Sequence, residues 1–311
     1  MSKCLVTGGA GFIGSHLTDK LISDGHDVIV IDNLSSGLKE QINPSAKFYE
    51  CDVREEKIAE IFEAEKPEYI FHFAAQMSVP FSVDDPLHDL DVNGMGILNL
   101  LESAKKLGIK KFIMSSTGGA IYGDATQIPT PETEIPKPLA PYGITKLLSE
   151  NYLYFYKKTY GLDYCVLRYA NVYGPRQLNA HESGVITIFI KAVLDSSSLK
   201  IYAYPDEPEG MTRDYVFVDD VVEANIAAMK STSGIYNIGT SVSTKTKELY
   251  NIISKITGIK VDISFHPPRE GDIKANTLNN RLAKEILGWS PNVDLKIGME
   301  KTIDYFKNIK K

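Results

Sequence analysis

A glycine-rich turn between a strand-like run and a helix-like run constrains the fold of this 311-residue chain more than any other stretch. The apolar run Cys4–Val6 is typical of a buried strand, and apolar side chains recur at helical spacing through Phe12–Ser23. Between and just after them stand Gly8, Gly11 and Gly14. Glycines allow a tight turn, a close approach of the backbone to a pyrophosphate, and close packing of the helix on its strand. A helix N-terminus also favours an anion, so the sequence predicts a dinucleotide-binding turn.

The next strand-like run supports this prediction and indicates which dinucleotide is bound. Asp27–Asp32 ends in an acid about 20 residues beyond the glycines, where a carboxylate can hold the ribose hydroxyls. The Asp32 carboxylate would repel a 2′-phosphate, and the adjacent segment Asn33–Leu38 contains no arginine. NAD is therefore favoured over NADP. The competing interpretation is that Asp32 merely ends a strand.

Strands and helices alternate through the first half of the chain, which predicts an α/β fold with a doubly wound parallel sheet of the Rossmann type. In such a sheet the ligand lies at the carboxyl ends of the strands. The later strands are expected at Lys47–Cys51, Tyr69–Phe73, Lys111–Met114 and Tyr164–Arg168, with a helix around Ile58–Phe62 and a long helix at Asp91–Leu107 that ends at Gly108.

Prolines break the alternation after residue 170, which suggests a second, smaller substrate-binding region. We expect an NAD-binding domain in residues 1–170 and a C-terminal substrate domain mainly in 171–311, with 212–240 returning to the first domain. Within the second half, helices are expected at Val185–Asp195, Asp220–Lys230 and Lys247–Thr257, and strands at Tyr215–Asp219 and Tyr236–Ile238.

Composition excludes several classes of protein. The net charge of −6 and the lack of a basic run argue against a nucleic-acid groove. The three cysteines lie in or at the end of strand-like runs and are expected to be buried and unpaired, and no histidine stands at metal-ligand spacing, so we expect no metal site. No apolar stretch approaches the length of a membrane span, and the first strand begins at once. We expect a cytoplasmic protein without a membrane or nucleic-acid partner.

A tyrosine and a lysine four residues apart are the candidate proton-transfer pair. Tyr142 and Lys146 open a helix after Pro141 and project from one face of it. A nearby ammonium favours the phenolate and lowers the tyrosine pKa toward neutrality. A hydroxyl from Ser115–Thr117, at the end of the neighbouring strand, could share the reacting oxygen. A helix with a surface lysine is the bland alternative for this pair in isolation.

Together these motifs resemble the extended short-chain dehydrogenase/reductase family and, within it, the nucleotide-sugar 4-epimerases of the UDP-galactose 4-epimerase type. The resemblance extends over nearly the whole chain, from Thr7–Gly14 to Arg269–Asp272. It implies cofactor contacts at Gly8, Gly11, Phe12, Ile13, Gly14, Asp32, Asn33, Ser35, Ser36, Gly37, Asp52, Val53, Phe73, Ala74, Ala75, Gln76, Asn93, Ser115, Tyr142, Lys146 and Tyr169. It implies contacts to a UDP-sugar at Thr117, Gly118, Tyr142, Asn171, Val185, Arg213, Arg269 and Asp272.

The resemblance also implies a mechanism. Tyr142 takes the proton of the sugar 4-hydroxyl while NAD takes the C4 hydride, and both return after the 4-keto sugar has rotated. The assisting hydroxyl is Thr117 when counted from the strand, with Ser116 in reserve. Gly118 and Gly119 stand where related dehydratases carry an acidic pair, so elimination lacks its acid and base. These glycines are also expected to leave space for the turning sugar.

The resulting hypothesis is a UDP-glucose 4-epimerase, and two alternatives stay open. The first changes the sugar to UDP-N-acetylglucosamine or UDP-glucuronate, because Asn276 resembles the position that limits the substituent at C2. The second is a non-catalytic NAD sensor, which is disfavoured because the Tyr142/Lys146 pair is present. By resemblance we also expect a homodimer formed through the Asp91–Leu107 and Tyr142–Tyr160 helices. The loop Tyr204–Gly210 is longer and more acidic than is usual in the family.

Overall fold

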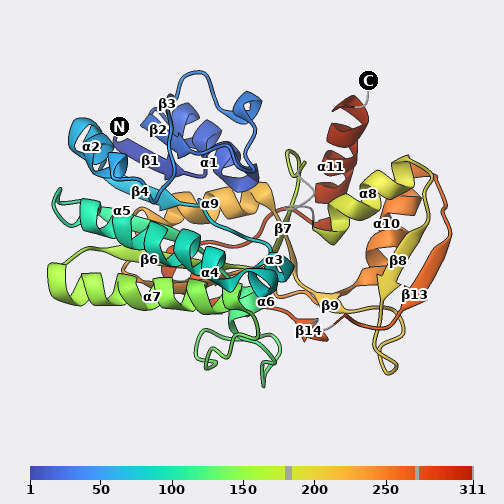
Figure 1. Cartoon of the computed structure of the whole chain (residues 1–311). Coiled ribbons are helices and arrows are strands. Elements are labelled where there is room, and N and C mark those ends of the chain that lie inside the picture. The colour runs from blue at the N-terminus through green and yellow to red at the C-terminus, as the bar shows by residue number, and fades with distance from the viewer. Residues whose placement is uncertain (179–183, 270–272, 310–311) are drawn as a thin grey trace.

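A seven-stranded parallel sheet is the centre of the computed structural model, which describes residues 1–178, 184–269 and 273–309 (Figure 1). The strand order is β11-β6-β5-β4-β1-β2-β3, so the order reverses between β1 and β4 and the chain is doubly wound as predicted. The strands are β1 (Lys3–Thr7), β2 (Asp27–Asp32), β3 (Lys47–Glu50), β4 (Tyr69–His72), β5 (Lys111–Thr117), β6 (Tyr164–Tyr169) and β11 (Gly234–Ile238).

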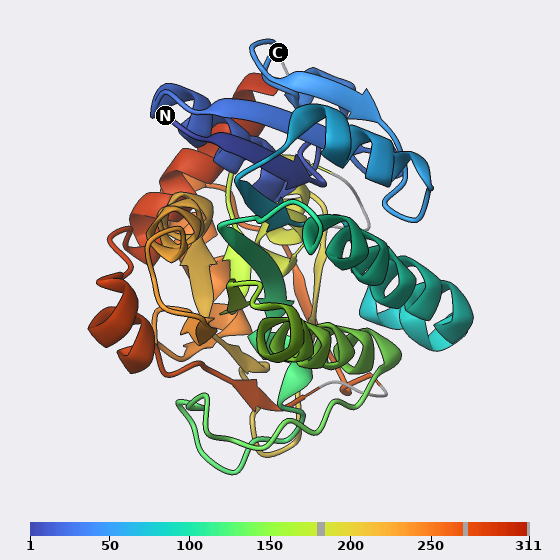
Figure 2. The ribbon, with the colours of Figure 1, turned by 90° about the vertical axis from the view of Figure 1, so that its left-hand side faces the viewer.

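Two helical layers cover the sheet, because neighbouring strand residues point to opposite faces. Cys4 and Val6 join a core with α1 (Phe12–Ser23) and α9 (Val218–Ala228). Leu5, between them, joins a second core on the other face. That face is covered by α2 (Lys57–Glu65), α5 (Gly96–Ala104) and α7 (Pro141–Tyr160). Figure 2 shows α9 on one side of the sheet and α5 and α7 on the other.

The long helix predicted at Asp91–Leu107 is wrong in its bounds and in its regularity. The helical segment begins earlier, at α4 (Pro86–Asp89), because Pro86 follows the N-cap Asp85, whose carboxylate accepts the amide of His88. A π-helical turn, η2 (Leu90–Met95), then precedes α5. A buried polar contact spans this wider turn, with Asn93 Nδ2 donating to Asp89 Oδ1 at 3.0 Å. Apolar spacing does not reveal such a contact, and so it predicted one regular helix.

The second half of the chain adds a lobe at the carboxyl end of the sheet (Figure 1). Its core joins α8 (Val185–Leu194), α10 (Thr246–Thr257) and α11 (Leu295–Ile309) to β8 (Leu199–Tyr202), which pairs with β13 (Ile263–His266). A three-stranded sheet holds β12 (Thr244–Lys245), β9 (Thr212–Arg213) and β14 (Ala275–Asn276). The shorter elements are η1 (Lys39–Gln41), α3 (Val79–Asp84), α6 (Gly118–Ile121) and η3 (Ala283–Leu287).

The segment after Arg213 only partly rejoins the large sheet. The strand predicted at Tyr215–Asp219 is shorter, because α9 begins at Val218. This strand, β10 (Tyr215–Phe217), pairs with β7 (Asn171–Tyr173) in a separate two-stranded sheet and not with the central one. By contrast, β11 pairs with β6 at the edge of the central sheet. Among the described residues, no helix combines the length and the apolar character needed to cross a membrane.

A buried ion pair fastens α7 to the sheet. Arg168 on β6 donates from Nη2 and Nε to the two carboxylate oxygens of Glu150, at 2.6 and 3.0 Å. Ser116 Oγ donates to the same carboxylate at 2.6 Å, and Arg168 Nη1 donates to the hydroxyl of Tyr122 at 2.8 Å. Because the hydrogen bonds satisfy both charged groups, the pair holds α7 at a fixed height on the sheet.

Replacing one partner of this pair should destabilise the protein strongly. In Arg168→Met, Glu150 stays buried without its cation, and we expect the free energy of unfolding to fall by about 3–5 kcal/mol. The double variant Arg168→Met/Glu150→Leu removes both charges and should recover most of that loss. Denaturant unfolding measures both, with the exposed Arg281→Met as control, since Arg281 pairs with Glu285 in solvent. Equal losses in the single and double variants would contradict this account.

Candidate active site

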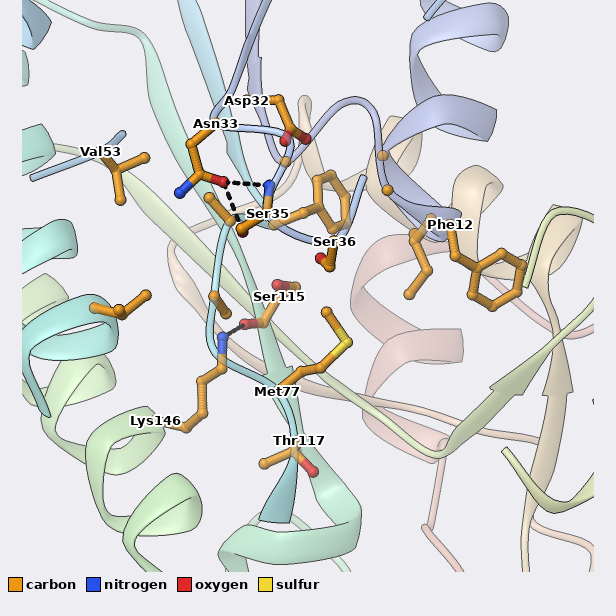
Figure 3. A pocket seen from close by; sticks show the side chains of 18 of the residues that line it. Phe12, Asp32, Asn33, Ser35, Ser36, Val53, Met77, Ser115, Thr117 and Lys146 are labelled. Atoms are coloured by element: carbon orange, nitrogen blue, oxygen red, sulfur yellow. Dashed lines mark hydrogen bonds between the residues drawn. The ribbon is translucent and has the colours of Figure 1, made fainter. Parts of the chain in front are cut away.

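A main pocket opens at the carboxyl ends of β1, β2, β4, β5 and β6, and most residues predicted to touch the cofactor line it (Figure 3). The predicted residues in the lining are Gly8, Gly11, Phe12, Ile13, Gly14, Asp32, Asn33, Ser35, Ser36, Asp52, Val53, Phe73, Ala74, Ala75, Ser115, Ser116, Thr117, Tyr142, Lys146 and Tyr169. Sequence reasoning did not select Ile31, Cys51, Met77, Val92, Ala170, Val172 and Gln177, which also line it. These are ordinary side chains brought in by tertiary packing, and no residue type or spacing marks them.

The glycine turn has the close contacts that a pyrophosphate site requires. Gly8 has a φ of +70°, and a Cβ there would lie 2.6 Å from the backbone nitrogen of Ala74. A Cβ on Gly14 would lie 2.2 Å from the carbonyl oxygen of Gly8. The helix cap residue is Gly11, so no side chain caps the first N–H groups of α1. These groups therefore remain suited to an anion at the pocket wall.

Asp32 fits a ribose diol at the other end of this turn. Its side chain is buried, and it accepts the amides of Ala10 at 3.0 Å and Leu34 at 2.8 Å, which fixes the carboxylate at the pocket. Burial raises the pKa of Asp32, and the two amide hydrogen bonds oppose that shift. Among the described lining residues Lys146 is the single cation, so this end offers no partner for a 2′-phosphate. The residues present therefore fit NAD better than NADP.

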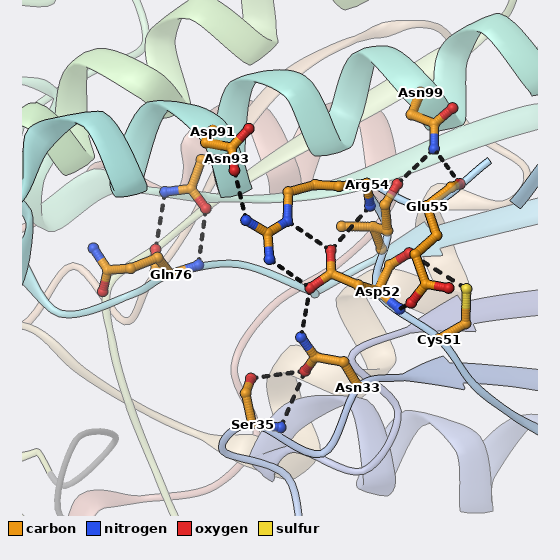
Figure 4. Close-up of polar contacts among 11 residues, drawn as sticks. Asn33, Ser35, Cys51, Asp52, Arg54, Glu55, Gln76, Asp91, Asn93 and Asn99 are labelled. Carbon is orange, nitrogen blue, oxygen red and sulfur yellow. Dashed lines mark hydrogen bonds and ion pairs between the residues drawn. The ribbon is translucent and has the colours of Figure 1, made fainter. Parts of the chain in front are cut away.

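A charged network fixes the rim of the pocket beside Asp52 and Val53 (Figure 4). Arg54 donates to both carboxylate oxygens of Asp52 at 2.8 Å and to Asp91 at 2.6 Å. Asn33 Nδ2 adds a further hydrogen bond to Asp52 at 2.8 Å. The Arg54 guanidinium is the main reason that the pKa of Asp52 is lowered to about 2.

Three of the predicted cofactor residues stand behind the lining. Asn93 accepts the Gln76 amide and donates to the Gln76 carbonyl, both at 2.9 Å, and so clamps the loop that follows β4 (Figure 4). Gly37 packs against the turn, where a Cβ would lie 2.8 Å from the Cβ of Ala10. Gln76, Asn93 and Gly37 therefore support the pocket wall.

Tyr142 and Lys146 lie on one face of α7, as predicted, and both line the main pocket. Lys146 Nζ lies 5.9 Å from the centre of the Tyr142 ring and donates to the Ser115 carbonyl at 3.2 Å (Figure 3). Burial lowers the pKa of Lys146 to about 8. Burial, with a smaller contribution from Asp89, raises the pKa of Tyr142. The predicted lowering of the Tyr142 pKa is therefore wrong for this arrangement, because the loss of hydration outweighs the ammonium.

The structure separates the two candidate hydroxyls, which alternate along β5. Ser116 is buried, and its hydroxyl donates to Glu150 at 2.6 Å within the network below the sheet. Thr117 is half-buried, and its Oγ1 accepts the amide of Ala120 at 3.1 Å as the cap of α6. That bond leaves the hydroxyl proton of Thr117 available to an acceptor in the pocket. Geometry therefore favours Thr117 as the assisting hydroxyl.

A second pocket, the substrate-side pocket, adjoins the first and shares Tyr142 with it. Asn171 and Val185 line it, and Asn171 Nδ2 also donates to the Asp214 carbonyl at 3.1 Å. The other lining residues are Met77, Val172, Tyr173, Gln177, Gly184, Ile186 and Tyr215. Sequence reasoning placed only Asn171, Val185 and Tyr142 here.

Three predicted substrate residues lie outside both linings, and Asp272 lies outside the described residues. Arg213 donates to the carbonyls of Thr212 and Lys274, and the Arg269 guanidinium stacks 4.7 Å above the ring of Tyr202. The space beside Gly118 is filled, since a Cβ there would lie 2.4 Å from Leu278. The expected room for a turning sugar at Gly118 is therefore not found.

The acidic loop at Tyr204–Gly210 has a structural role in this region. Its acids pair with lysines next to the small three-stranded sheet that carries Arg213. Glu207 contacts Lys245 at 3.1 Å and Glu209 contacts Lys247 at 3.3 Å, while Asp206 pairs with Lys274. These exposed pairs tie the loop to the edge of the sheet.

Comparison with known proteins agrees with this site. The model of the NAD-dependent epimerase/dehydratase family matches residues 4–239. A UDP-glucose 4-epimerase of Mycolicibacterium smegmatis is 42% identical over 98% of this chain and 99% of its own. The structure of the Thermotoga maritima UDP-glucose 4-epimerase with UDP-glucose is 49% identical, with a TM-score of 0.96 over 99% of this chain and 100% of that one.

A UDP-glucose 4-epimerase of Thermus thermophilus in complex with NAD is also similar, at 40% identity and a TM-score of 0.91 over 98% of this chain and 99% of that one. Since the family model covers most of the chain and the relatives align over nearly all of it, the glycine turn, Asp32 and the Tyr142/Lys146 pair are family features. The chain belongs to the NAD-dependent epimerase/dehydratase family.

Proposed function

We propose that this enzyme interconverts UDP-glucose and UDP-galactose with NAD as its cofactor. The observation that carries the proposal is the position of Tyr142, which lines both the main pocket and the substrate-side pocket. A proton carrier at the junction of two pockets can serve a sugar that enters from one side and a nicotinamide that lies on the other. Similarity to several UDP-glucose 4-epimerases supports this substrate.

In the proposed reaction the protein holds the two ligands and moves one proton. NAD, when bound, supplies the acceptor and later the donor of the C4 hydride. The Tyr142 oxygen takes the proton of the sugar 4-hydroxyl and later returns it, and the Thr117 hydroxyl hydrogen-bonds to the same sugar oxygen. Lys146 stands behind Tyr142, where its positive charge favours the phenolate. Asp32 holds the adenosine ribose, and the start of α1 holds the pyrophosphate.

The remaining substrate contacts are part of the proposal. Asn171 and Val185 contact the UDP-sugar from the substrate-side pocket. Gly118 and Asp272 are assigned to the sugar and nucleotide by resemblance, and Arg213 and Arg269 to the diphosphate, whose oxygens a guanidinium can bind with two hydrogen bonds. Because these arginines lie outside the described linings, the proposal requires them to turn toward the diphosphate when it binds.

UDP-N-acetylglucosamine remains the second candidate substrate, because of Asn276. This residue is short and buried, and its Nδ2 donates to the Gly118 carbonyl at 3.0 Å, while its Oδ1 has no hydrogen-bond partner. A buried acceptor of this kind is costly unless a donor reaches it, and an acetamido N–H is one such donor. UDP-glucuronate and a non-catalytic NAD sensor are separate outcomes of the assay below.

The proposal includes a cytoplasmic location, two domains and a homodimer. Three free cysteines fit a reducing compartment. The expected division is residues 1–170 and 171–311, with 212–240 returning to the first domain. The homodimer is supported by exposed apolar side chains on the neighbouring helices α4, η2 and α7, which are Leu87, Leu90, Met95, Ile144, Tyr154 and Phe155.

Replacing the proton carrier tests the reaction. Without added NAD, the purified enzyme should convert UDP-glucose to UDP-galactose, as followed by NMR of the sugar protons. Tyr142→Phe should lower turnover by roughly 10²–10⁴-fold, because the ring stays and the proton carrier is lost. The exposed Tyr154→Phe is the matched control. Conversion of only N-acetylated or glucuronate sugars would replace the substrate, and retained NAD without any turnover would favour the sensor.

Replacing Lys146 should abolish turnover and stabilise the fold at neutral pH. Burial lowers the Lys146 pKa from 10.5 to about 8, so the folded state disfavours the charged lysine that the unfolded chain keeps. This cost is complete below pH 8 and disappears as the pH rises toward 10.5, where the unfolded lysine also loses its proton. Lys146→Met should therefore be more stable by roughly 1–3 kcal/mol at pH 7, with a smaller gain at higher pH. Denaturant unfolding from pH 7 to 10, with the exposed Lys307→Met as control, measures this difference.

Charging the apolar helix surface tests the homodimer. Leu87 is 78% exposed and Phe155 is 47% exposed, so Leu87→Glu/Phe155→Glu should leave the monomer folded and dissociate the dimer. Light scattering coupled to size-exclusion chromatography should give the mass of two chains for the wild type and of one for the variant. Ile297→Glu on α11 is the control, because Ile297 is also exposed but lies in the C-terminal lobe. A wild-type mass of one chain would disprove the dimer.

A further inference from the structure

A carboxylate lies behind the catalytic pair, and the proposed reaction gives it no role. Asp89, the last residue of α4, is 0% exposed. Its Oδ1 accepts Gln76 Nε2 at 2.7 Å and Asn93 Nδ2 at 3.0 Å, and its Oδ2 accepts Thr145 Oγ1 at 2.7 Å. All three donors are neutral. Removing a carboxylate from water is expensive unless a positive charge compensates it, so the charge of Asp89 calls for a cation nearby.

The three donors come from three different parts of the active site. Gln76 belongs to the loop after β4, which contributes Phe73, Ala74 and Ala75 to the main pocket. Asn93 lies in η2 and clamps the backbone of Gln76. Thr145 lies in α7, and its hydroxyl is 3.1 Å from the carbonyl of Tyr142. Asp89 therefore joins one wall of the cofactor pocket to the first turn of the catalytic helix.

The charge of Asp89 acts on both members of the catalytic pair. For Lys146, burial lowers the pKa, and the nearby carboxylates of Asp89 and Glu150 oppose that shift. For Tyr142, burial raises the pKa and Asp89 raises it further. The other titratable groups around the pair are accounted for, since Glu150 is bound by Arg168, and burial lowers the pKa of His72 to about 3, which leaves it neutral.

We propose that Asp89 is a positioning residue of the epimerase, the buried counter-charge that keeps Lys146 an ammonium ion and ties its helix to the cofactor loop. This inference rests on the proposed function, because it assigns Lys146 and Tyr142 their roles in proton transfer. The geometry of the cluster supports it independently of the reaction, since Asp89 accepts hydrogen bonds from both the loop and the helix.

The variant Asp89→Asn separates charge from shape. The amide oxygen can accept Gln76 Nε2 and Asn93 Nδ2 as the carboxylate does. The amide nitrogen can donate to Thr145 Oγ1, whose hydroxyl then donates to the Tyr142 carbonyl, 3.1 Å away. The cluster can thus keep its hydrogen bonds while losing one negative charge. Asp89→Ser, which leaves room for a water among the same donors, is the second variant if the amide does not fold.

Removing the charge should move the pH profile of kcat as a whole. Turnover requires Tyr142 without its proton and Lys146 with its proton, and Asp89 raises both pKa values. In Asp89→Asn both the acidic and the alkaline limb should therefore shift to lower pH, by roughly one unit. Thr145→Val, which removes one hydrogen bond but keeps the charge, should lower stability and leave both limbs in place. Unshifted limbs in a folded Asp89→Asn enzyme would overturn the inference.

A titration without substrate keeps this inference separate from the proposed function. The phenolate absorbance of the purified holoenzyme, minus that of Tyr142→Phe, reports the ionisation of Tyr142 in the wild type and in the Asp89→Asn background. The Tyr142 transition should occur at lower pH in Asp89→Asn, and an unchanged transition would overturn the role of Asp89. If no UDP-sugar is epimerised but the transition moves, the proposed function fails and the electrostatic role of Asp89 stands.

Discussion

The close approach of two backbone segments at Gly8 sets the geometry on which the site depends. The turn after β1 passes the loop after β4 so closely that a side chain on Gly8 would meet the nitrogen of Ala74 at 2.6 Å. These two strands are neighbours at the point where the strand order reverses, so their following segments diverge to opposite faces of the sheet. The crevice between them is the main pocket, and it exists because both segments have a minimal backbone there.

Buried charge is the second constraint on this active site. Lys146 and Asp89 both lie out of water on the same side of the sheet, and the Glu150–Arg168 pair lies directly below. Each of these groups costs free energy that the fold must offset, which is the expected condition of a site that tunes proton affinity. The hydrogen bonds around Asp89 and Glu150 hold α7 in place, and α7 carries the proton carrier Tyr142.

The two lobes share residues, so ligand contacts on one side depend on packing on the other. Phe12 belongs to the glycine turn, yet its side chain packs in the core of the C-terminal lobe with α8 and α11. The His16 ring, also on α1, contacts the Pro175 carbonyl at 3.0 Å. The N-terminus of α1, which is suited to the pyrophosphate, is therefore positioned by both lobes.

The sequence by itself determined the central sheet and the cofactor half of the site. Local spacing and turn chemistry act over a few residues, and they predicted β2 at Asp27–Asp32, α1 at Phe12–Ser23 and the Tyr142/Lys146 face of α7. They failed where long-range packing decides. The π-helical turn in η2, the pairing of β10 with β7, the filling of the space beside Gly118, and the direction of the Tyr142 pKa shift all depend on contacts between distant segments.

Asp89 illustrates this division. In the sequence it is an ordinary acid near the start of a helix, where an exposed carboxylate is the usual outcome. Its burial arises because Gln76, Asn93 and Thr145 are brought around it by three separate elements. The residues that carry the chemistry could be read from their type and spacing, whereas only the tertiary structure decided which charges surround them, because desolvation and hydrogen bonding depend on neighbours that are distant in the chain.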